Sequence, residues 1–141
     1  MVNFLMMYSE YMYMIAFTVL RIGIGLLFVV HGYLKLMGGI EEWRWTGEQM
    51  ANLGITFFPV FCGLCAVAAE LGGGICLTLG FATRLVTPFM MFTMFIAVIH
   101  HVVKGDPYGY ISFPASQFLI FLTVFIAGSG KYSLDWWLFS R

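Results

Sequence analysis

Four long apolar segments constrain the fold of this 141-residue chain more than any other feature of its sequence. They lie at about residues 11–30, 58–80, 85–103 and 113–128, and each is close to the roughly 20 apolar residues that a helix needs to cross a bilayer. In lipid, backbone amides must be hydrogen-bonded within the segment, so each segment should be a helix. The sequence therefore predicts an all-α fold, a polytopic membrane four-helix bundle, formed by a single domain over residues 1–141.

The composition supports a lipid environment. Hydrophobic residues make up 61% of the chain and charged residues only 10%, whereas roughly a quarter of an ordinary soluble domain is charged. The main partner is therefore expected to be the lipid bilayer. The formal net charge is zero and basic residues do not cluster, which excludes nucleic acid as a partner. The N-terminus lacks the positively charged leader of a signal peptide, so the first apolar segment is expected to remain in the mature protein.

An even number of spans places both termini on one side of the membrane, here called face A. The loops after the first and third spans then lie on the opposite side, face B. Lysine and arginine are equally numerous on the two faces, so the positive-inside rule does not determine the orientation of the protein in the membrane. Arg84 in a tight turn, and the pair Trp136 and Trp137 near the C-terminus, favour cytoplasmic termini.

The first loop is long and amphiphilic, with Trp43 and Trp45 among several glutamates. Such a segment is typical of a short helix lying on the membrane surface. It would cover a site on face B, or it would be an ordinary interfacial connector; both interpretations stay open.

Two charged residues fall inside predicted spans, where an isolated charge costs at least about 2.5 kcal/mol. Arg21 and Glu70 are each about twelve residues from face B, so the sequence predicts that they form an ion pair. Small residues at helical spacing line the same helix faces and would let the two helices approach closely. The pair either fixes the register of the helices or serves as a proton relay or ligand site.

A second polar group is expected at face B, where His31, Lys35, His100, His101 and Gln117 lie near helix ends. Histidine titrates near neutral pH and could exchange protons with a quinone, bind a metal or haem, or simply pack. A metal or haem is disfavoured, because Lys35 beside His31 opposes a cation; no metal site is predicted. The C-x-x-C pair Cys62 and Cys65 lies in apolar surroundings, so packing and thiol–disulfide chemistry both remain interpretations.

Three motifs resemble a known family. They are R-I-G-I-G-L-L-F-V-V-H-G-Y-L-K-L from residue 21, A-E-L-G-G-G-I-C-L-T-L-G-F-A-T-R from residue 69, and G-S-G-K-Y-S-L-D from residue 128. In this order they resemble the DoxX family of four-helix membrane proteins. The positions that match its motifs are Arg21, His31, Gly32, Lys35, Glu70, Gly73, Arg84, Tyr132 and Asp135.

The resemblance implies a multi-pass protein of the inner (plasma) membrane, related to the small subunit of thiosulfate:quinone oxidoreductase. It also implies relatives linked to oxidative-stress and thiol-redox complexes. The family brings no agreed catalytic assignment for the matching positions, and the pair Cys62 and Cys65 lies outside the motifs.

The leading functional hypothesis is a membrane subunit of a redox system, which binds quinone and docks an oxidoreductase partner. The candidate catalytic residues are Arg21, Glu70 and His31. The candidate ligand-binding residues are Lys35, His100, His101 and Gln117. Whether the chain is itself an enzyme stays open. The alternatives are a small-molecule or ion transporter that uses the buried charges, enlarged by homo-oligomer formation, and a non-catalytic membrane scaffold.

Overall fold

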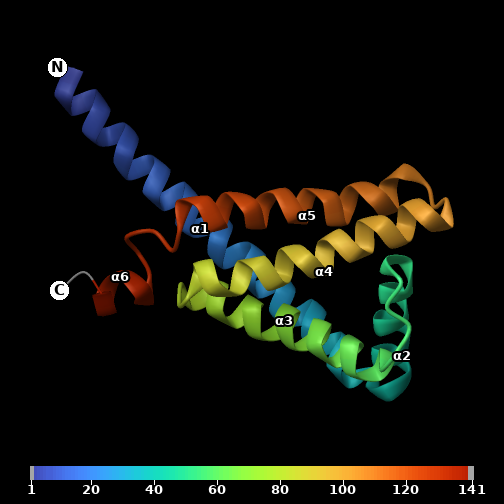
Figure 1. The fold of residues 1–141 in the computed structure, drawn as a ribbon. Coiled ribbons are helices and arrows are strands. Elements are labelled where there is room, and N and C mark those ends of the chain that lie inside the picture. Colours follow the sequence, from blue (N-terminus) through green and yellow to red (C-terminus); the bar gives the residue numbers. More distant parts are fainter. Residues whose placement is uncertain (1, 140–141) are drawn as a thin grey trace.

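The computed structural model of the chain describes the backbone of residues 2–139 and the side chains of residues 9–139. Helices dominate the described part (Figure 1). They are α1 (Val2–Met37), α2 (Gly39–Glu48), the 3-10 helix η1 (Gln49–Leu53), α3 (Pro59–Leu79), α4 (Thr83–Lys104), α5 (Tyr108–Ala127) and the short α6 (Leu134–Phe139).

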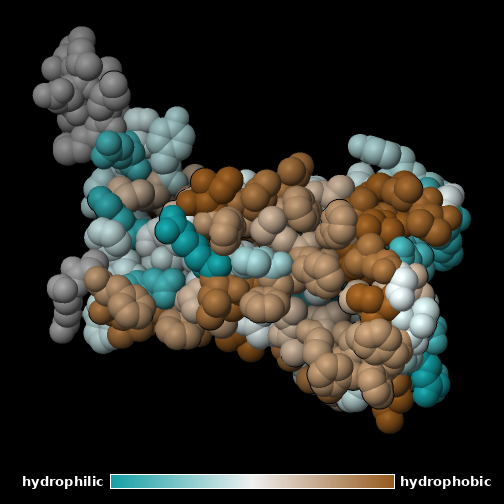
Figure 2. Space-filling model, in the orientation of Figure 1, coloured by the Kyte–Doolittle hydropathy of each residue, from teal (hydrophilic) through white to brown (hydrophobic). Residues whose placement is uncertain are grey.

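Four of these helices contain segments that are long and apolar enough to cross a membrane. The segments are Ser9–Met37, Pro59–Leu79, Thr83–Lys104 and Tyr108–Ala127. Large apolar side chains are exposed on them, among them Leu27, Phe89 and Ile126. Apolar residues cover the length of the bundle on the face shown in Figure 2, and hydrophilic residues gather toward its two ends. The predicted all-α polytopic membrane four-helix bundle is confirmed.

Helix α1 is longer than the sequence predicted, because it continues past residue 30 to Met37. Lys35 lies in the last turn of α1, and its ammonium group is 3.0 Å from a carboxylate oxygen of Glu70 on α3. The helix instead stops at two glycines, of which Gly39 has a φ of +72° that disfavours other residues.

The bundle is a wedge. Helix α1 packs along α3, and α4 packs along α5. The two pairs lie close together on face A, where residues 80–82 join α3 to α4, and they separate toward face B (Figure 1). The predicted surface helix of the first loop is present as α2, which packs on α3, and η1 continues it to α4. Together α2 and η1 bridge the wide end of the wedge.

Glycines allow α1 and α3 to touch through their backbones, as the small-residue pattern predicted. A Cβ atom at Gly25 would overlap Thr78 and the carbonyl oxygen of Gly74. One at Gly32 would overlap the backbone of Leu71. These contacts fix the register of the two antiparallel helices.

Glycines also bring α2 against α3. A Cβ atom at Gly47 would overlap the carbonyl group of Pro59, and one at Gly63 would overlap the carbonyl group of Trp43. Gly63, which the small-residue pattern of this helix placed toward α1, therefore faces α2. Helix α2 is thus seated by direct backbone contact on the first turns of α3.

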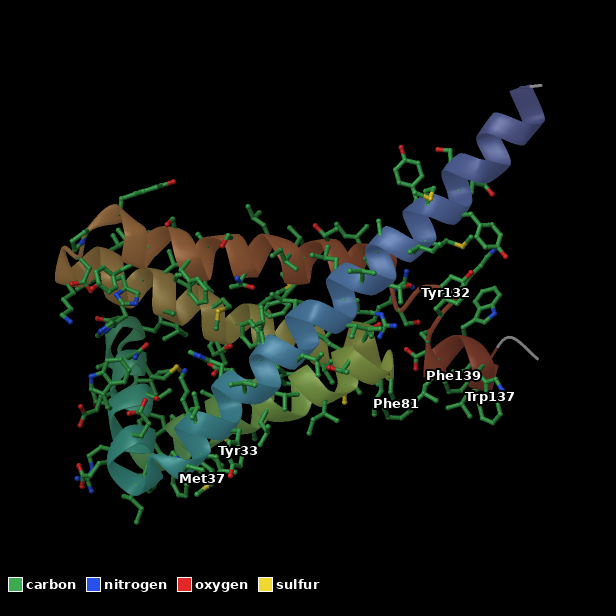
Figure 3. All side chains as sticks on the ribbon, turned by 180° about the vertical axis from the view of Figure 1, so that it is seen from behind. Tyr33, Met37, Phe81, Tyr132, Trp137 and Phe139 are labelled. Atoms are coloured by element: carbon green, nitrogen blue, oxygen red, sulfur yellow. The ribbon has the colours of Figure 1, made fainter. Side chains whose placement is uncertain are left out.

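The predicted ion pair between Arg21 and Glu70 is wrong. The guanidinium group of Arg21 donates hydrogen bonds to the carbonyl oxygens of Leu77 and Thr78 at the C-terminal end of α3, and to that of Tyr132 at 2.7 Å. Tyr132 lies near face A, whereas Tyr33 and Met37 lie at the face B end of α1 (Figure 3). Arg21 lies farther from face B than the sequence predicted, because α1 continues to Met37. In the observed register, Gly32 lies beside Leu71, so Lys35 reaches Glu70 while Arg21 reaches the end of α3.

Arg21 thereby satisfies carbonyl groups that a helix leaves unpaired at its C-terminus, and its charge opposes the negative end of the helix dipole. Only 1% of the surface of Arg21 is exposed. Asp135 is the complementary group, because its carboxylate accepts hydrogen bonds from the backbone N–H groups of Ala82 and Thr83 at the start of α4. The narrow end of the wedge is therefore closed by polar contacts with helix ends.

The substitution Gly25→Ala should destabilise the protein, because the added methyl group forces α1 away from α3. We expect a loss of about 1–3 kcal/mol, measured as a lower melting temperature in mild detergent. Gly23→Ala is the matched control on the same helix, since its Cβ atom would meet nothing within 4 Å. Equal melting temperatures for the two variants would contradict the observed register.

Replacement of Arg21 by leucine should also lower the melting temperature, by an amount equivalent to about 2–4 kcal/mol, because it removes the charged donors that link α1 to the end of α3 and to Tyr132. Arg21→Lys should recover only part of this loss, since one ammonium group cannot reproduce the fork of donors. Arg44→Leu is the control, because Arg44 pairs with Glu41 on the exposed surface. A variant R21L that melts like the wild type would show that these hydrogen bonds do not hold the helix ends together.

Candidate functional site

A cavity of about 1150 Å³ lies between the two helix pairs, inside the wide part of the wedge. All five of the helices α1–α5 contribute to its wall, and so does η1. Most of the wall is apolar, with residues such as Leu34, Phe61, Ala66, Phe89, Phe92 and Phe113. The polar residues in the wall include His31, Lys35, Thr46, Gln49, Glu70 and His101. An apolar cavity with few polar groups is the usual form of a small-molecule site.

Glu70 is the most deeply buried ionisable group in this wall, with 1% of its surface exposed. It lies eleven residues into α3, about 16 Å from the face B end of that helix. Its Oε1 atom accepts a hydrogen bond from Nζ of Lys35 at 3.0 Å. Its Oε2 atom lies 3.8 Å from Nε2 of His31 but accepts no hydrogen bond. One carboxylate oxygen thus accepts a hydrogen bond, and the other is buried without one.

The three side chains form a polar patch with distinct abilities. Lys35 offsets the charge of Glu70, which would otherwise be costly to bury. The side chain of His31 is 47% exposed, so it connects the buried pair with the surroundings. Because histidine gains and loses a proton near neutral pH, the patch can supply or accept protons as well as hydrogen bonds.

A second polar group lies toward face B, where α4 ends. Nδ1 of His101 is 2.7 Å from Oδ2 of Asp106, and Nζ of Lys104 is 3.9 Å from the same oxygen. The hydrogen bond with His101 is the main reason why the pKa of the Asp106 carboxyl lies below its ordinary value. His101 lines the cavity, so this group sits at its edge.

The cavity brings together four of the predicted site residues, namely His31, Lys35, Glu70 and His101. The other three lie elsewhere in the described structure. Arg21 binds helix ends on face A. His100 lies 3.4 Å from Asn52 and packs edge-on to Trp45. Gln117 is buried within α5, and its Oε1 atom has no hydrogen-bond partner.

The predicted site residues did not include those that α2 and η1 add to the wall, such as Thr46 and Gln49. The only signal was the amphiphilic character of the first loop. Its position is fixed in part by Trp43, whose indole N–H donates to the carbonyl oxygen of Lys35 at 3.2 Å. The loop therefore lies against the end of α1 that carries the polar patch.

Cys62 and Cys65 both line the cavity from the first turns of α3, and both are free thiols. A thiol–disulfide role for them stays a hypothesis. Within the described residues, no three His, Cys, Asp or Glu side chains gather closely enough to hold a metal ion.

Comparisons with known proteins identify the family of the chain. The family model described as DoxX matches residues 16–102, which include the polar patch, α2 and most of α4. The inner membrane protein YphA of Escherichia coli (strain K12) is 36% identical over 123 residues, which cover 82% of this chain and 84% of that protein. No solved structure matches the chain. The family match and this relative together show that the chain belongs to the DoxX family.

Proposed function

We propose that the protein is a quinone-binding membrane subunit of a redox system and that the cavity is its quinone site. The observation that carries the proposal is the carboxylate of Glu70, which is buried in the wall with Lys35 on one oxygen and no hydrogen bond on the other. A buried polar atom without a partner is costly, and a ligand that bonds to this patch would remove the cost.

A quinone suits both parts of the wall. Its ring and isoprenoid tail are apolar and would lie against side chains such as Phe89, Phe92 and Phe113. Its carbonyl oxygens accept hydrogen bonds, and Lys35 and His31 supply donors beside Glu70. A lipid-soluble ligand would reach such a site from within the bilayer.

Reduction of a quinone to a quinol takes up two electrons and two protons. The described chain has no nucleotide-binding fold to carry hydride chemistry, so the electrons would come from a redox protein docked on face B. His31 would pass protons from the surroundings to the ligand, and Lys35 would hold a ligand oxygen. Glu70 would hold Lys35 in place through their ion pair.

The relative from Escherichia coli is an inner membrane protein, which supports the same location for this chain. Cytoplasmic termini and a homo-oligomer formed through the apolar faces of α4 and α5 remain predictions from the sequence.

Saturable binding of decylubiquinone to the protein in lipid nanodiscs tests the proposal. Trp45 lines the cavity, so a bound quinone should quench its fluorescence. Glu70→Gln and Lys35→Gln should each raise the Kd about tenfold or more, because charge-assisted hydrogen bonds are lost. Glu41→Gln is the control, since Glu41 is 83% exposed on the outer side of α2. Trp45→Phe should remove the saturable part of the quenching.

Unsaturable quenching that is the same in empty nanodiscs would contradict the quinone site. Saturable binding with equal Kd in E70Q, K35Q and the wild type would show that the ion pair does not bind the quinone. Its role would then be to link α1 to α3, as expected of a scaffold.

Proton-coupled transport is a second candidate, because the wedge is closed on face A and wide on face B while Glu70 lies near mid-span. It predicts a proton flux in proteoliposomes under an applied membrane potential, and E70Q should abolish this flux. A pH-sensitive dye enclosed in the vesicles measures it. The quinone proposal expects no flux in the absence of quinone and reductant.

A further inference from the structure

Thr46 on α2 is a second buried polar residue in the cavity wall whose side-chain oxygen has no hydrogen-bond partner. The residue is 8% exposed, and its Oγ1 atom makes no hydrogen bond. It lines the same cavity as Glu70, from a different helix. Two residues of the cavity wall, Glu70 on α3 and Thr46 on α2, therefore each have a buried oxygen without a hydrogen bond.

The free hydroxyl of Thr46 is unusual for a threonine in this protein. Other helical threonines bond to a backbone carbonyl of the preceding turn; these are Thr18, Thr78, Thr87, Thr93 and Thr123. That local bond is available to any threonine in a helix. Thr83 is also unpaired, but it lies at the start of α4 and not in the cavity wall. Because Thr46 does not make this local bond, its hydroxyl is available to a ligand in the cavity.

The position of Thr46 relative to the polar patch is fixed by the fold. Trp43, one helical turn earlier, donates its indole N–H to the carbonyl oxygen of Lys35. Gly47, the next residue, makes backbone contact with Pro59 and Gly63 of α3. Thr46 is thus held beyond the end of α1, nearer to face B than Glu70.

We infer that the cavity takes a ring-shaped ligand with two separated hydrogen-bonding groups, one held by the patch of Glu70, Lys35 and His31 and the other by the hydroxyl of Thr46. This inference rests on the proposed quinone site and adds its second anchor. A para-quinone carries two such groups on opposite sides of its ring. A fatty acid or another lipid with a single head would leave Thr46 unpaired.

A hydroxyl is well suited to this position, because it both donates and accepts hydrogen bonds. It donates to the carbonyl oxygen of a quinone and accepts from the hydroxyl group of a quinol. The hydroxyl of Thr46 would therefore bind the oxidised and the reduced ligand alike, while the patch of Glu70, Lys35 and His31 exchanges protons with the ligand.

The test compares Thr46→Val with Thr93→Val, using the protein in nanodiscs. Both residues line the cavity, but the hydroxyl of Thr93 is already bonded to the carbonyl oxygen of Met90. The T46V variant should raise the Kd of decylubiquinone about three- to tenfold, whereas T93V should change it less than about twofold. Para-decylphenol, which has one polar group, should bind to T46V and the wild type with similar Kd.

The melting temperature without quinone gives a second readout. Removal of an unpaired buried hydroxyl should raise it in T46V, on the order of 3 °C. A lower melting temperature in T46V would show that the hydroxyl has a structural partner and would overturn the inference.

The outcomes separate this inference from the proposed function. If decylubiquinone binds to the wild type and T46V binds it equally well, the second anchor is wrong and the quinone site stands. If T46V loses affinity for decylubiquinone and para-decylphenol alike, the hydroxyl does not read a second group, and the inference is wrong. If the wild type binds no decylubiquinone, both proposals fail.

Discussion

The direct backbone contact of α3 with both α1 and α2 is the constraint on which the rest of the structure depends. Membrane helices gain little from burying apolar surface against each other, because lipid is equally apolar, so close packing must supply the attraction. Gly25 and Gly32 bring α1 against α3, and Gly47 and Gly63 bring α2 against the same helix. The first contact sets Lys35 beside Glu70. The second sets Thr46 in the wall of the cavity. Four positions without a side chain thus place the polar groups that the cavity presents.

The cavity lies where the two helix pairs diverge, because they are close together on face A and are connected toward face B through α2 and η1. On face A, Arg21 ties α1 to the last carbonyl groups of α3, and Asp135 ties the C-terminal segment to the start of α4. Both contacts use the unpaired backbone groups of helix ends, which are strong hydrogen-bonding partners in an apolar environment. Toward face B the pairs diverge, and α2 with η1 spans the gap between them (Figure 1). Arg21 therefore shapes the site from a distance, by holding its narrow end together, and does not line it.

The sequence predicted the architecture well because hydropathy reports directly on the lipid environment. The four spans, the helix in the first loop and the buried positions of Arg21 and Glu70 all follow from this signal. Hydropathy does not report the register between two helices, so the sequence did not predict that Lys35 is the partner of Glu70. A lysine near the expected end of a span suggests the start of a loop, but here Lys35 is part of α1 and pairs with Glu70. Thr46 gave no signal, since an uncharged threonine in a connecting loop is unremarkable until its hydroxyl is found buried.

The energetic cost of the polar groups argues for a binding role over a purely structural one. A buried ion pair can often be replaced by well-packed apolar residues without loss of stability, so Glu70 and Lys35 are not explained by stability alone. The unpaired oxygens of Glu70 and Thr46 add further cost, about 1–3 kcal/mol for each buried polar atom that lacks a partner. A ligand with matching groups would recover that cost on binding, and so the same atoms that weaken the empty bundle would supply affinity and orientation to its ligand.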